Sequence, residues 1–287
     1  MKAALIYFSG TGNTKRTLEY AKENIPFDFD VFDVMNNEVV DMENYDYLMV
    51  FYPIYGFNAP KPIIDYVKKI KKTKSEKKCL VMKNSGEHLF WNNASSLLLR
   101  RILKRRNIKL KSEYHYLMPY SFIFRHSDYM AYRMDYVAKN LIKIDMNEFL
   151  NGKYSKIKRF FLDDLFACIL RIQWWGGRFN GRFYKIDETK CIKCMKCVNN
   201  CPAKNIKFED GKFKFGKNCL MCQRCVMYCP KDAFKSLGGF TSWKVSTPYS
   251  FKEQTEFQEE KRPKYCKKNY EKYFKTSFEK IEKHESQ

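Results

Sequence analysis

The chain has 287 residues, and its 54 lysines and arginines outnumber its 32 aspartates and glutamates, which gives a formal net charge of +22. Hydrophobic residues make up 45% of the sequence, and this excludes disorder and leaves room for two domains. No apolar run reaches the roughly 18 residues of a membrane-spanning helix, and the first residues lead into a strand pattern instead of a signal peptide, so we expect a cytoplasmic protein.

The first predicted element is a buried strand over residues 2–8, and a loop of small and hydroxyl-bearing residues follows it. The loop reads Ser9-Gly10-Thr11-Gly12-Asn13-Thr14, and a helical pattern continues from residue 15 to 24. Glycines let the backbone approach an anion, hydroxyls can donate to it, and the helix N-terminus adds partial positive charge. We expect a phosphate site here; a turn that binds nothing is the alternative. The string is neither a Walker loop nor G-x-G-x-x-G, which disfavours an NTPase and a dinucleotide fold.

Alternating strands and helices follow in this half of the chain. Strands are predicted over residues 28–34, 46–52, 78–83 and 114–118, and helices over 60–72 and 92–107. This order predicts an α/β fold with a doubly wound parallel sheet, whose ligand site lies at the carboxyl ends of the strands. Two further loops should meet the phosphate loop there: the second loop, Pro53-Ile54-Tyr55-Gly56-Phe57-Asn58, and the third loop, Asn84-Ser85-Gly86.

Aromatic faces in the second loop and backbone amides in the third suit an isoalloxazine ring, although core packing is the alternative for Tyr55 and for Phe57. On these motifs, residues 1–150 resemble a flavodoxin, whose [ST]-x-T-G-x-T pattern the phosphate loop matches. The resemblance implies FMN, with its phosphate at Ser9–Thr14 and its ring between the other two loops. Two features depart from the family: the second loop lacks tryptophan, and the surface is basic where theirs is acidic.

Residues 151–183 are expected to form a basic amphipathic linker. Residues 153–184 contain seven basic and two acidic residues, and apolar residues recur at helical spacing from Ile157 to Trp174, with Leu165 and Ile169 among them. We expect this face to bridge two domains; peripheral association with an anionic membrane through residues 153–175 is the alternative. A second basic helix is expected over residues 97–111, as a solvated face or a docking site for an acidic protein.

Eleven cysteines in a cytoplasmic chain indicate reactive, structural or metal-binding thiols. Eight of them form two runs of identical spacing, C-x2-C-x2-C-x3-C-P, offset by 28 residues. This spacing predicts two [4Fe-4S] clusters that exchange their fourth ligand between the runs. The expected ligand sets are Cys191, Cys194, Cys197 and Cys229 for one cluster, and Cys219, Cys222, Cys225 and Cys201 for the other. Paired zinc knuckles are the disfavoured alternative, because zinc sites need neither the third cysteine nor the proline.

Residues 184–240 resemble a bacterial two-cluster ferredoxin, including a predicted hairpin over residues 206–215 with Asp-Gly at its turn. Its departure from the family is charge, since residues 185–239 contain 12 basic and 5 acidic residues. The whole chain is similar to the fused flavodoxin-ferredoxin proteins of anaerobes. The expected fold is therefore a flavodoxin-like doubly wound parallel sheet followed by a small α+β two-cluster ferredoxin domain. Residues 241–287 are expected to be a charged C-terminal extension, of which residues 252–287 are expected to be solvated or partly disordered.

The function that we expect is electron transfer, because each cluster moves one electron and FMN can hold one or two. The chain would relay electrons between two [4Fe-4S] clusters and FMN and to a protein partner, which its positive charge predicts to be acidic. No nucleic acid is expected, because no binding motif accompanies the charge. The alternative is a flavin-dependent oxidoreductase that reduces a small organic substrate and receives its electrons from the ferredoxin module. A third possibility is a basic binding protein whose clusters are structural. We assign no catalytic residue, and the sequence favours a carrier over an enzyme.

Overall fold

The computed structural model describes residues 1–36, 38–155, 161–236, 243–256 and 264–286. Contacts divide the chain into two compact units, and the chain passes between them more than once. The sheet unit comprises Met1–Met118, Arg133–Arg171 and Arg262–Gln287, and the cysteine unit comprises Pro119–Tyr132 and Ile172–Lys261. Within the described residues, we find no helix with the length and apolar character needed to cross a membrane.

The sheet unit contains five parallel strands in the order β2-β1-β3-β4-β5. They are β1 (Lys2–Tyr7), β2 (Asp28–Asp33), β3 (Tyr47–Pro53), β4 (Lys77–Ser85) and β5 (Ile108–Leu117). This order confirms the predicted doubly wound sheet and is the flavodoxin-like one. The middle strands β1, β3 and β4 are buried along most of their length, as strands covered on both faces must be.

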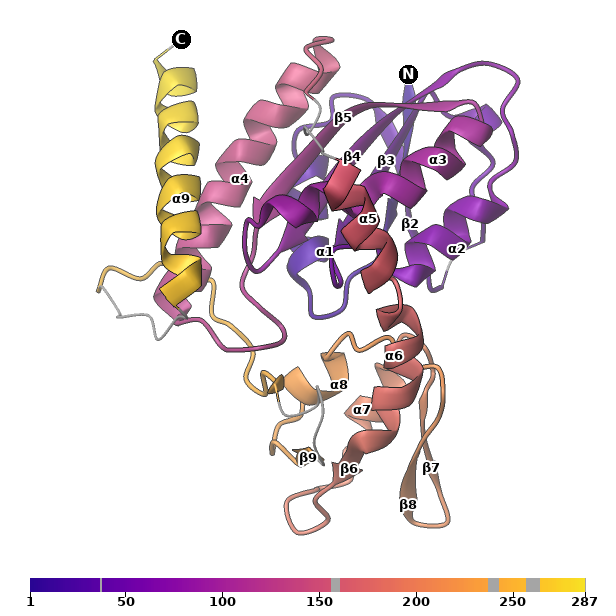
Figure 1. Cartoon of the computed structure of the whole chain (residues 1–287), viewed down its shortest axis with the longest axis vertical. Helices are drawn as coiled ribbons and strands as arrows, with labels where there is room; N and C mark the ends of the chain where they lie inside the picture. Colours follow the sequence, from indigo (N-terminus) through magenta and orange to yellow (C-terminus); the bar gives the residue numbers. More distant parts are fainter. Residues whose placement is uncertain (37, 156–160, 237–242, 257–263, 287) are drawn as a thin grey trace. The chain divides into compact units, whose positions relative to one another are not determined.

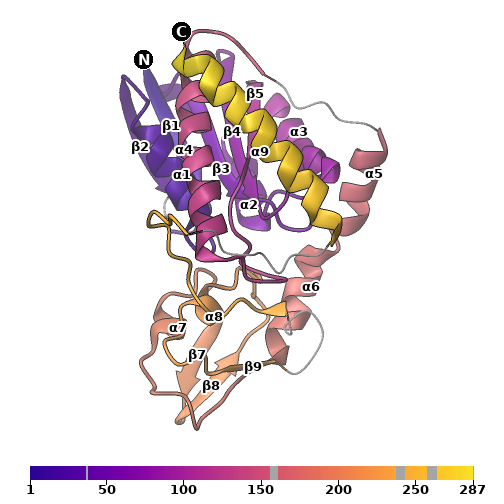
Figure 2. The same cartoon turned by 90° about the vertical axis from the view of Figure 1, so that its left-hand side faces the viewer.

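Helices cover both faces of this sheet. They are α1 (Asn13–Lys22), α2 (Lys61–Lys69), α3 (Leu97–Arg105) and α4 (Asp128–Leu150), with 3-10 helices η1 (Met42–Asn44) and η2 (Phe90–Ser96). Figures 1 and 2 show α2 and α3 on one face and α1 and α4 on the other. The Tyr20 hydroxyl of α1 donates to the Asp135 carboxylate of α4 at 2.7 Å. The basic helix expected over residues 97–111 ends at Arg105, because Ile108 and Leu110 alternate with lysines and begin β5.

The end of the chain forms helix α9 (Lys264–Glu285), so the expectation of a solvated or partly disordered extension is wrong for these residues. Its buried apolar side chains lie at helical spacing: Tyr270, Tyr273, Phe274 and Ile281. The Lys280 ammonium of α9 forms ion pairs at 2.6 and 3.0 Å with two carboxylates of α4, and α9 lies beside α4 in Figure 1. Burying an apolar face against the sheet unit explains why a charged segment folds here.

The predicted linker forms two helices, α5 (Phe161–Leu170) and α6 (Gln173–Asn180), and its residues 156–160 lie outside the described part of the chain. On α5, Phe166 packs against Trp91 of η2 with ring centroids 4.3 Å apart. Leu165 and Ile169, which we expected on the buried face, are 49% and 60% exposed. Bridging and membrane association both stay predictions.

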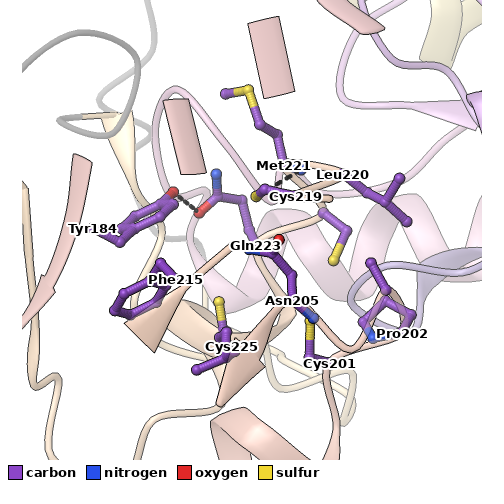
Figure 3. A pocket seen from close by; sticks show the side chains of 13 residues that line it. Tyr184, Cys201, Pro202, Asn205, Phe215, Cys219, Leu220, Met221, Gln223 and Cys225 are labelled. Carbon is purple, nitrogen blue, oxygen red and sulfur yellow. Dashed lines mark hydrogen bonds between the residues drawn. The ribbon is translucent and has the colours of Figure 1, made fainter. Parts of the chain in front are cut away.

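The cysteine unit has a small core of its own, formed by Tyr184, Ile206, Val226 and Phe234. Two antiparallel strand pairs belong to it: β6 (Tyr184–Ile186) pairs with β9 (Phe234–Ser236), and β7 (Ile206–Glu209) pairs with β8 (Lys212–Phe215). Its short helices are α7 (Lys196–Asn199), α8 (Arg224–Met227) and the 3-10 helix η3 (Gly181–Phe183). The second pair confirms the predicted hairpin, with positive φ at both turn residues, Asp210 and Gly211. Figure 3 shows the Tyr184 hydroxyl donating to the Gln223 side chain, at 2.9 Å.

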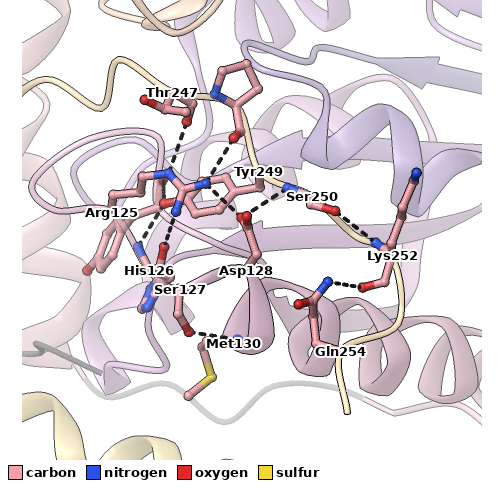
Figure 4. A network of polar contacts seen from close by, with 12 residues as sticks. Arg125, His126, Ser127, Asp128, Met130, Thr247, Tyr249, Ser250, Lys252 and Gln254 are labelled. Atoms are coloured by element: carbon pink, nitrogen blue, oxygen red, sulfur yellow. Dashed lines mark hydrogen bonds and ion pairs between the residues drawn. The ribbon is translucent and has the colours of Figure 1, made fainter. Parts of the chain in front are cut away.

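Residues 243–254 are part of the cysteine unit and pack there by polar contacts that Figure 4 shows. The Arg125 guanidinium donates to the Asp128 carboxylate at 2.7 Å and to the carbonyl oxygen of Pro248 at 3.0 Å. The same carboxylate accepts from the backbone N–H of Ser250 at 3.1 Å. The segment after the second cysteine run is therefore held by charge-assisted hydrogen bonds and is not simply a solvated tail.

Candidate functional site

Both cysteine runs fold in the same local way, 28 residues apart in the sequence. Lys193 and its counterpart Met221 both have a φ of 51°, in the left-handed region. This turn directs the Lys193 N–H to the Cys191 sulfur and the Met221 N–H to the Cys219 sulfur, each at 3.4 Å. Backbone donors to cysteine sulfur are what cluster ligands need to hold their negative charge. The repeat in the sequence is therefore also a repeat in structure.

The fourth cysteine of each run lies with the other run, as the ligand exchange predicts. One cavity is lined by Cys201, Cys219, Cys222 and Cys225, and the other by Cys191, Cys194, Cys197 and Cys229 (Figure 3 shows the first). The sulfurs of Cys201 and Cys229 again have matching donors, the backbone N–H groups of Asn205 and Ala233, both at 3.3 Å. The structure thus brings together both predicted sets of four cysteines.

Burial makes these thiols poor anions by themselves. Burial raises the pKa of the Cys219 thiol to about 12 and that of Cys197 to about 11. A thiolate in such a place requires a cation, and coordination to a metal supplies one. No three of the described His, Cys, Asp or Glu side chains converge on one point as the ligands of a single ion do. Four sulfurs around each of two cavities fit a cluster in chemistry and in arrangement.

The three loops of the sheet unit meet at the carboxyl ends of the strands, as predicted, and Asn84 joins them. The Thr14 hydroxyl of the phosphate loop donates to the Asn84 side-chain oxygen at 2.8 Å. The backbone N–H of Ile54, in the second loop, donates to the Asn84 carbonyl oxygen, also at 2.8 Å. The Tyr55 ring lies edge-on to Phe8, with centroids 6.2 Å apart.

The phosphate loop is shaped around Gly12, whose φ of 105° favours glycine and turns the chain into α1. The Ser9 side-chain oxygen accepts from the backbone N–H groups of Gly12 and Lys15, at 3.2 and 3.3 Å, and so fixes the loop's form. The first turn of α1 contains no acidic residue. A helix N-terminus without a nearby carboxylate retains the partial positive charge that a phosphate prefers, so the loop fits the predicted ligand.

The second loop forms a tight turn in which the backbones of Tyr55 and Asn58 exchange two hydrogen bonds of 3.0 Å. The Asn58 amide donates to the carbonyl oxygen of Ala167 on α5 at 2.8 Å. The Phe57 ring packs edge-on against Trp91, with centroids 5.6 Å apart. Both aromatic candidates therefore pack against a neighbouring ring, Phe57 against Trp91 and Tyr55 against Phe8, and stacking of either on a flavin stays a prediction.

Sequence reasoning missed the residues that support the third loop from a distance. The Ser85 hydroxyl lies 2.8 Å from the Nε2 atom of His115 on β5. The Tyr270 hydroxyl of α9 donates to the Gly86 carbonyl oxygen. The signal for Tyr270 was present, because apolar residues recur at helical spacing through the charged C-terminal segment. His115 carried no such signal, since only the sheet register brings it beside Ser85.

A buried ion pair lies directly before the third loop. The Lys83 ammonium on β4 is 2.6 Å from the Glu113 carboxylate on β5, and both side chains are almost fully buried. The ammonium also donates to the Ser95 hydroxyl and to the Asn92 carbonyl oxygen, both at 2.9 Å. These bonds satisfy charges that would otherwise be costly to bury, and they fix the end of β4. The sequence signal that could have predicted this ion pair is the position of Lys83 directly after the apolar run of this strand.

Residues 190–233 match the family model described as a 4Fe-4S dicluster domain. The cysteine unit contains a 4Fe-4S dicluster domain. Together with the flavodoxin-like strand order of the sheet unit, this match shows a flavodoxin-like fold joined to a 4Fe-4S dicluster domain, which supports an electron-transfer or redox protein. The matched residues span both cysteine runs and include all eight cysteines that line the two cavities.

Solved structures similar to the chain include a Fusobacterium nucleatum flavodoxin bound to flavin mononucleotide (16% identity, 54% of this chain, 99% of that chain, TM-score 0.39). An NAD(P)H:quinone oxidoreductase from Methanothermobacter marburgensis is also similar (12% identity, 52% of this chain, 97% of that chain, TM-score 0.41). So is an FMN-dependent NADH-azoreductase from Bacillus anthracis (12% identity, 52% of this chain, 99% of that chain, TM-score 0.37). No curated protein matches the chain. The strand order β2-β1-β3-β4-β5 identifies the fold of the sheet unit.

Proposed function

We propose that this chain relays electrons between two [4Fe-4S] clusters and FMN, and that it exchanges electrons with an acidic protein partner. When bound, the clusters supply one-electron steps and FMN supplies steps of one or two electrons. The observation that carries the proposal is the presence, in one chain, of two complete sets of four cysteines and of three loops that meet at the carboxyl ends of a flavodoxin-like sheet. Reduced thiols as ligands favour the cytoplasm as the compartment.

The cysteine unit would hold the two clusters in the exchanged arrangement, each with three cysteines of one run and the fourth of the other. Matching backbone N–H groups, such as those of Lys193 and Met221, stabilise the negative sulfur atoms. The apolar core around Val226 and Phe234 lies next to both runs and limits the access of water. The chain's own contribution is to fix the ligands and to exclude solvent.

The sheet unit would hold FMN with the residues that the sequence predicted. The loop from Ser9 to Thr14, which includes Gly10, Thr11, Gly12 and Asn13, would bind the phosphate at the N-terminus of α1. The second loop, Pro53, Ile54, Tyr55, Gly56, Phe57 and Asn58, and the third loop, Asn84, Ser85 and Gly86, would contact the ring. The bond from Thr14 to Asn84 supports this assignment, because it fixes the phosphate loop against the third loop.

Charge supports an acidic partner. The dicluster region, residues 185–239, contains 12 basic and 5 acidic residues, and the whole chain has a net charge of +22. A positive surface raises the rate of encounter with an acidic protein and lowers it with a basic one, and salt weakens both effects. Low-potential electron carriers with acidic surfaces are the partners that fit this charge.

The variant that combines Thr11→Ala with Thr14→Ala should lose FMN. The Thr11 hydroxyl would donate to the charged phosphate, and such a bond contributes about 1.5–3 kcal/mol, so its loss should lower the affinity by about tenfold or more. Thr14→Ala also removes the 2.8 Å bond to Asn84 and loosens the third loop. The measurement is FMN retained per chain after anaerobic purification, followed by titration of the stripped protein with FMN.

Thr276→Ala is the matched control, because this hydroxyl bonds only carbonyl groups within α9 and lies far along the chain from the three loops. The control should retain about one FMN per chain, as one flavodoxin-like site predicts. Equal retention in the double variant would contradict the assignment of the phosphate loop. Fast reduction of the flavin by NADH without a protein partner would favour a flavin-dependent oxidoreductase over the carrier.

A further inference from the structure

The structural repeat allows the surroundings of the two cysteine sites to be compared position by position. We call residues 190–196 the open cysteine loop and residues 218–224, which lie 28 positions later, the covered cysteine loop. Cys194 is exposed, whereas its counterpart Cys222 is only 9% exposed. Ile192 is 58% exposed, whereas its counterpart Leu220 is half-buried. Two loops with the same backbone form therefore differ in their access to solvent.

The covered cysteine loop owes part of its cover to two glycines of the preceding segment. A Cβ atom at Gly181 would lie 2.4 Å from the Cys219 Cβ atom, and one at Gly177 would lie 2.6 Å from the Cys219 carbonyl oxygen. No other residue type could approach Cys219 so closely without displacing it. This segment, α6 with η3, precedes the part of the chain that matches the dicluster model, and so it adds a cover to one cluster site.

The open cysteine loop is also the basic one. Lys190, Lys193 and Lys196 are all exposed. At the matching positions the covered cysteine loop has Asn218, Met221 and Arg224, and the half-buried Arg224 donates to a backbone carbonyl at 3.3 Å. Among nearby acids, Asp187 is paired with Lys235 at 3.1 Å, which leaves Glu188 as the exposed carboxylate beside three lysines. The local field is therefore positive around the exposed cysteine.

We propose that the cluster held by Cys191, Cys194, Cys197 and Cys229 is the one that exchanges electrons with the partner, and that an acidic ferredoxin-type protein docks on the lysines of the open cysteine loop. This inference rests on the proposed function and adds the surface on which the protein partner docks. In each encounter one electron passes between the partner's iron-sulfur centre and this cluster; one centre is oxidised, the other is reduced, and no bond is made or broken. Electron transfer slows steeply with distance, so exposure of Cys194 favours this route.

The test replaces Lys193 and Lys196 by glutamate and measures exchange with a chemically reduced, acidic plant-type [2Fe-2S] ferredoxin. Anaerobic stopped-flow mixing at low ionic strength gives the second-order rate constant. We expect that constant to fall by about tenfold or more, and its dependence on salt to weaken, because the charges that steer the encounter are reversed. For the neutral variant, Lys193→Gln with Lys196→Gln, the rate constant should fall less, by about threefold. This variant replaces the charge-reversed one in the test if the reversed charges disturb cluster assembly.

The matched control reverses two exposed lysines of the β7–β8 hairpin, Lys207→Glu with Lys212→Glu, and changes the net charge by the same amount. Its rate constant should stay within about twofold of the unmodified protein. Equal falls in the two charge-reversed variants would overturn the docking site, because overall charge alone would then explain them. Absence of exchange in the unmodified protein would also overturn it. Transfer from chemically reduced clusters to FMN within the chain tests the relay separately.

Discussion

Replacing Cys201 by alanine should remove the cluster that Cys219, Cys222 and Cys225 hold, and should leave the cluster of its own run in place. The reason is geometric, because Cys201 lines the cavity of the second run and not the cavity of the first. Two cubes contain about eight iron and eight sulfide, so the variant should retain about half of each. Iron and sulfide analysis of anaerobically purified protein measures the loss, and EPR of the reduced protein identifies the cluster that remains.

Cys168→Ala is the control for this substitution, because Cys168 is an exposed cysteine of α5 in the sheet unit and lines neither cavity. It should retain the full content of iron and sulfide. Loss of the Cys191 cluster alone in the Cys201 variant would contradict the exchange of ligands. Zinc in place of iron in the unmodified protein would contradict both clusters and restore the knuckle alternative.

Replacing Lys83 by methionine should destabilise the sheet unit by about 3–5 kcal/mol, because it leaves the buried Glu113 carboxylate without its partner. In the native protein, the ammonium also satisfies Ser95 and the Asn92 carbonyl group. Lys83 lies next to Asn84, so loss of the pair should also loosen the joint between the phosphate loop and the third loop. Hydrogen exchange of peptides that cover β4 reports the local free energy of opening without assuming two-state unfolding of the whole chain.

Lys61→Met is the matched control, since the ion pair of Lys61 with Asp65 lies on the surface of α2. Exposed pairs of this kind contribute about 0–1 kcal/mol, so the control should leave the protection of β4 unchanged. Replacing Lys83 and Glu113 together by methionine and leucine should recover much of the loss, because no buried charge remains. Equal protection of β4 in the Lys83 variant and the unmodified protein would show that the pair does not stabilise the strand.

The parts of the fold that could be predicted from sequence are those that local patterns determine. Continuous apolar runs identified the central strands, the small-residue loop after β1 located the turn into α1, and the repeated cysteine spacing predicted both ligand sets. The Asp-Gly pair predicted the hairpin turn, because both of its residues accept positive φ. In each case a short stretch of residues contains the whole physical reason.

The parts that sequence reasoning missed depend on contacts between distant residues or on patterns hidden by composition. Helix α9 was obscured because charged residues dominate its segment, although Tyr270, Tyr273 and Phe274 follow a helical spacing. The contact of Ser85 with His115 follows from the register of β4 and β5, which no single stretch of sequence determines. The difference between the two cysteine loops was missed for a third reason, because the covering glycines lie outside the cysteine runs.

Anaerobic stopped-flow spectroscopy can show whether the clusters and the flavin exchange electrons within one chain. The fully loaded protein is mixed with a low-potential chemical donor that reduces the clusters, and the flavin and cluster bands are followed separately. We expect the flavin to be reduced after the clusters, at a rate that stays constant when the protein is diluted, because the transfer is intramolecular. A flavin that stays oxidised, or a rate that falls in proportion to protein concentration, would contradict the relay.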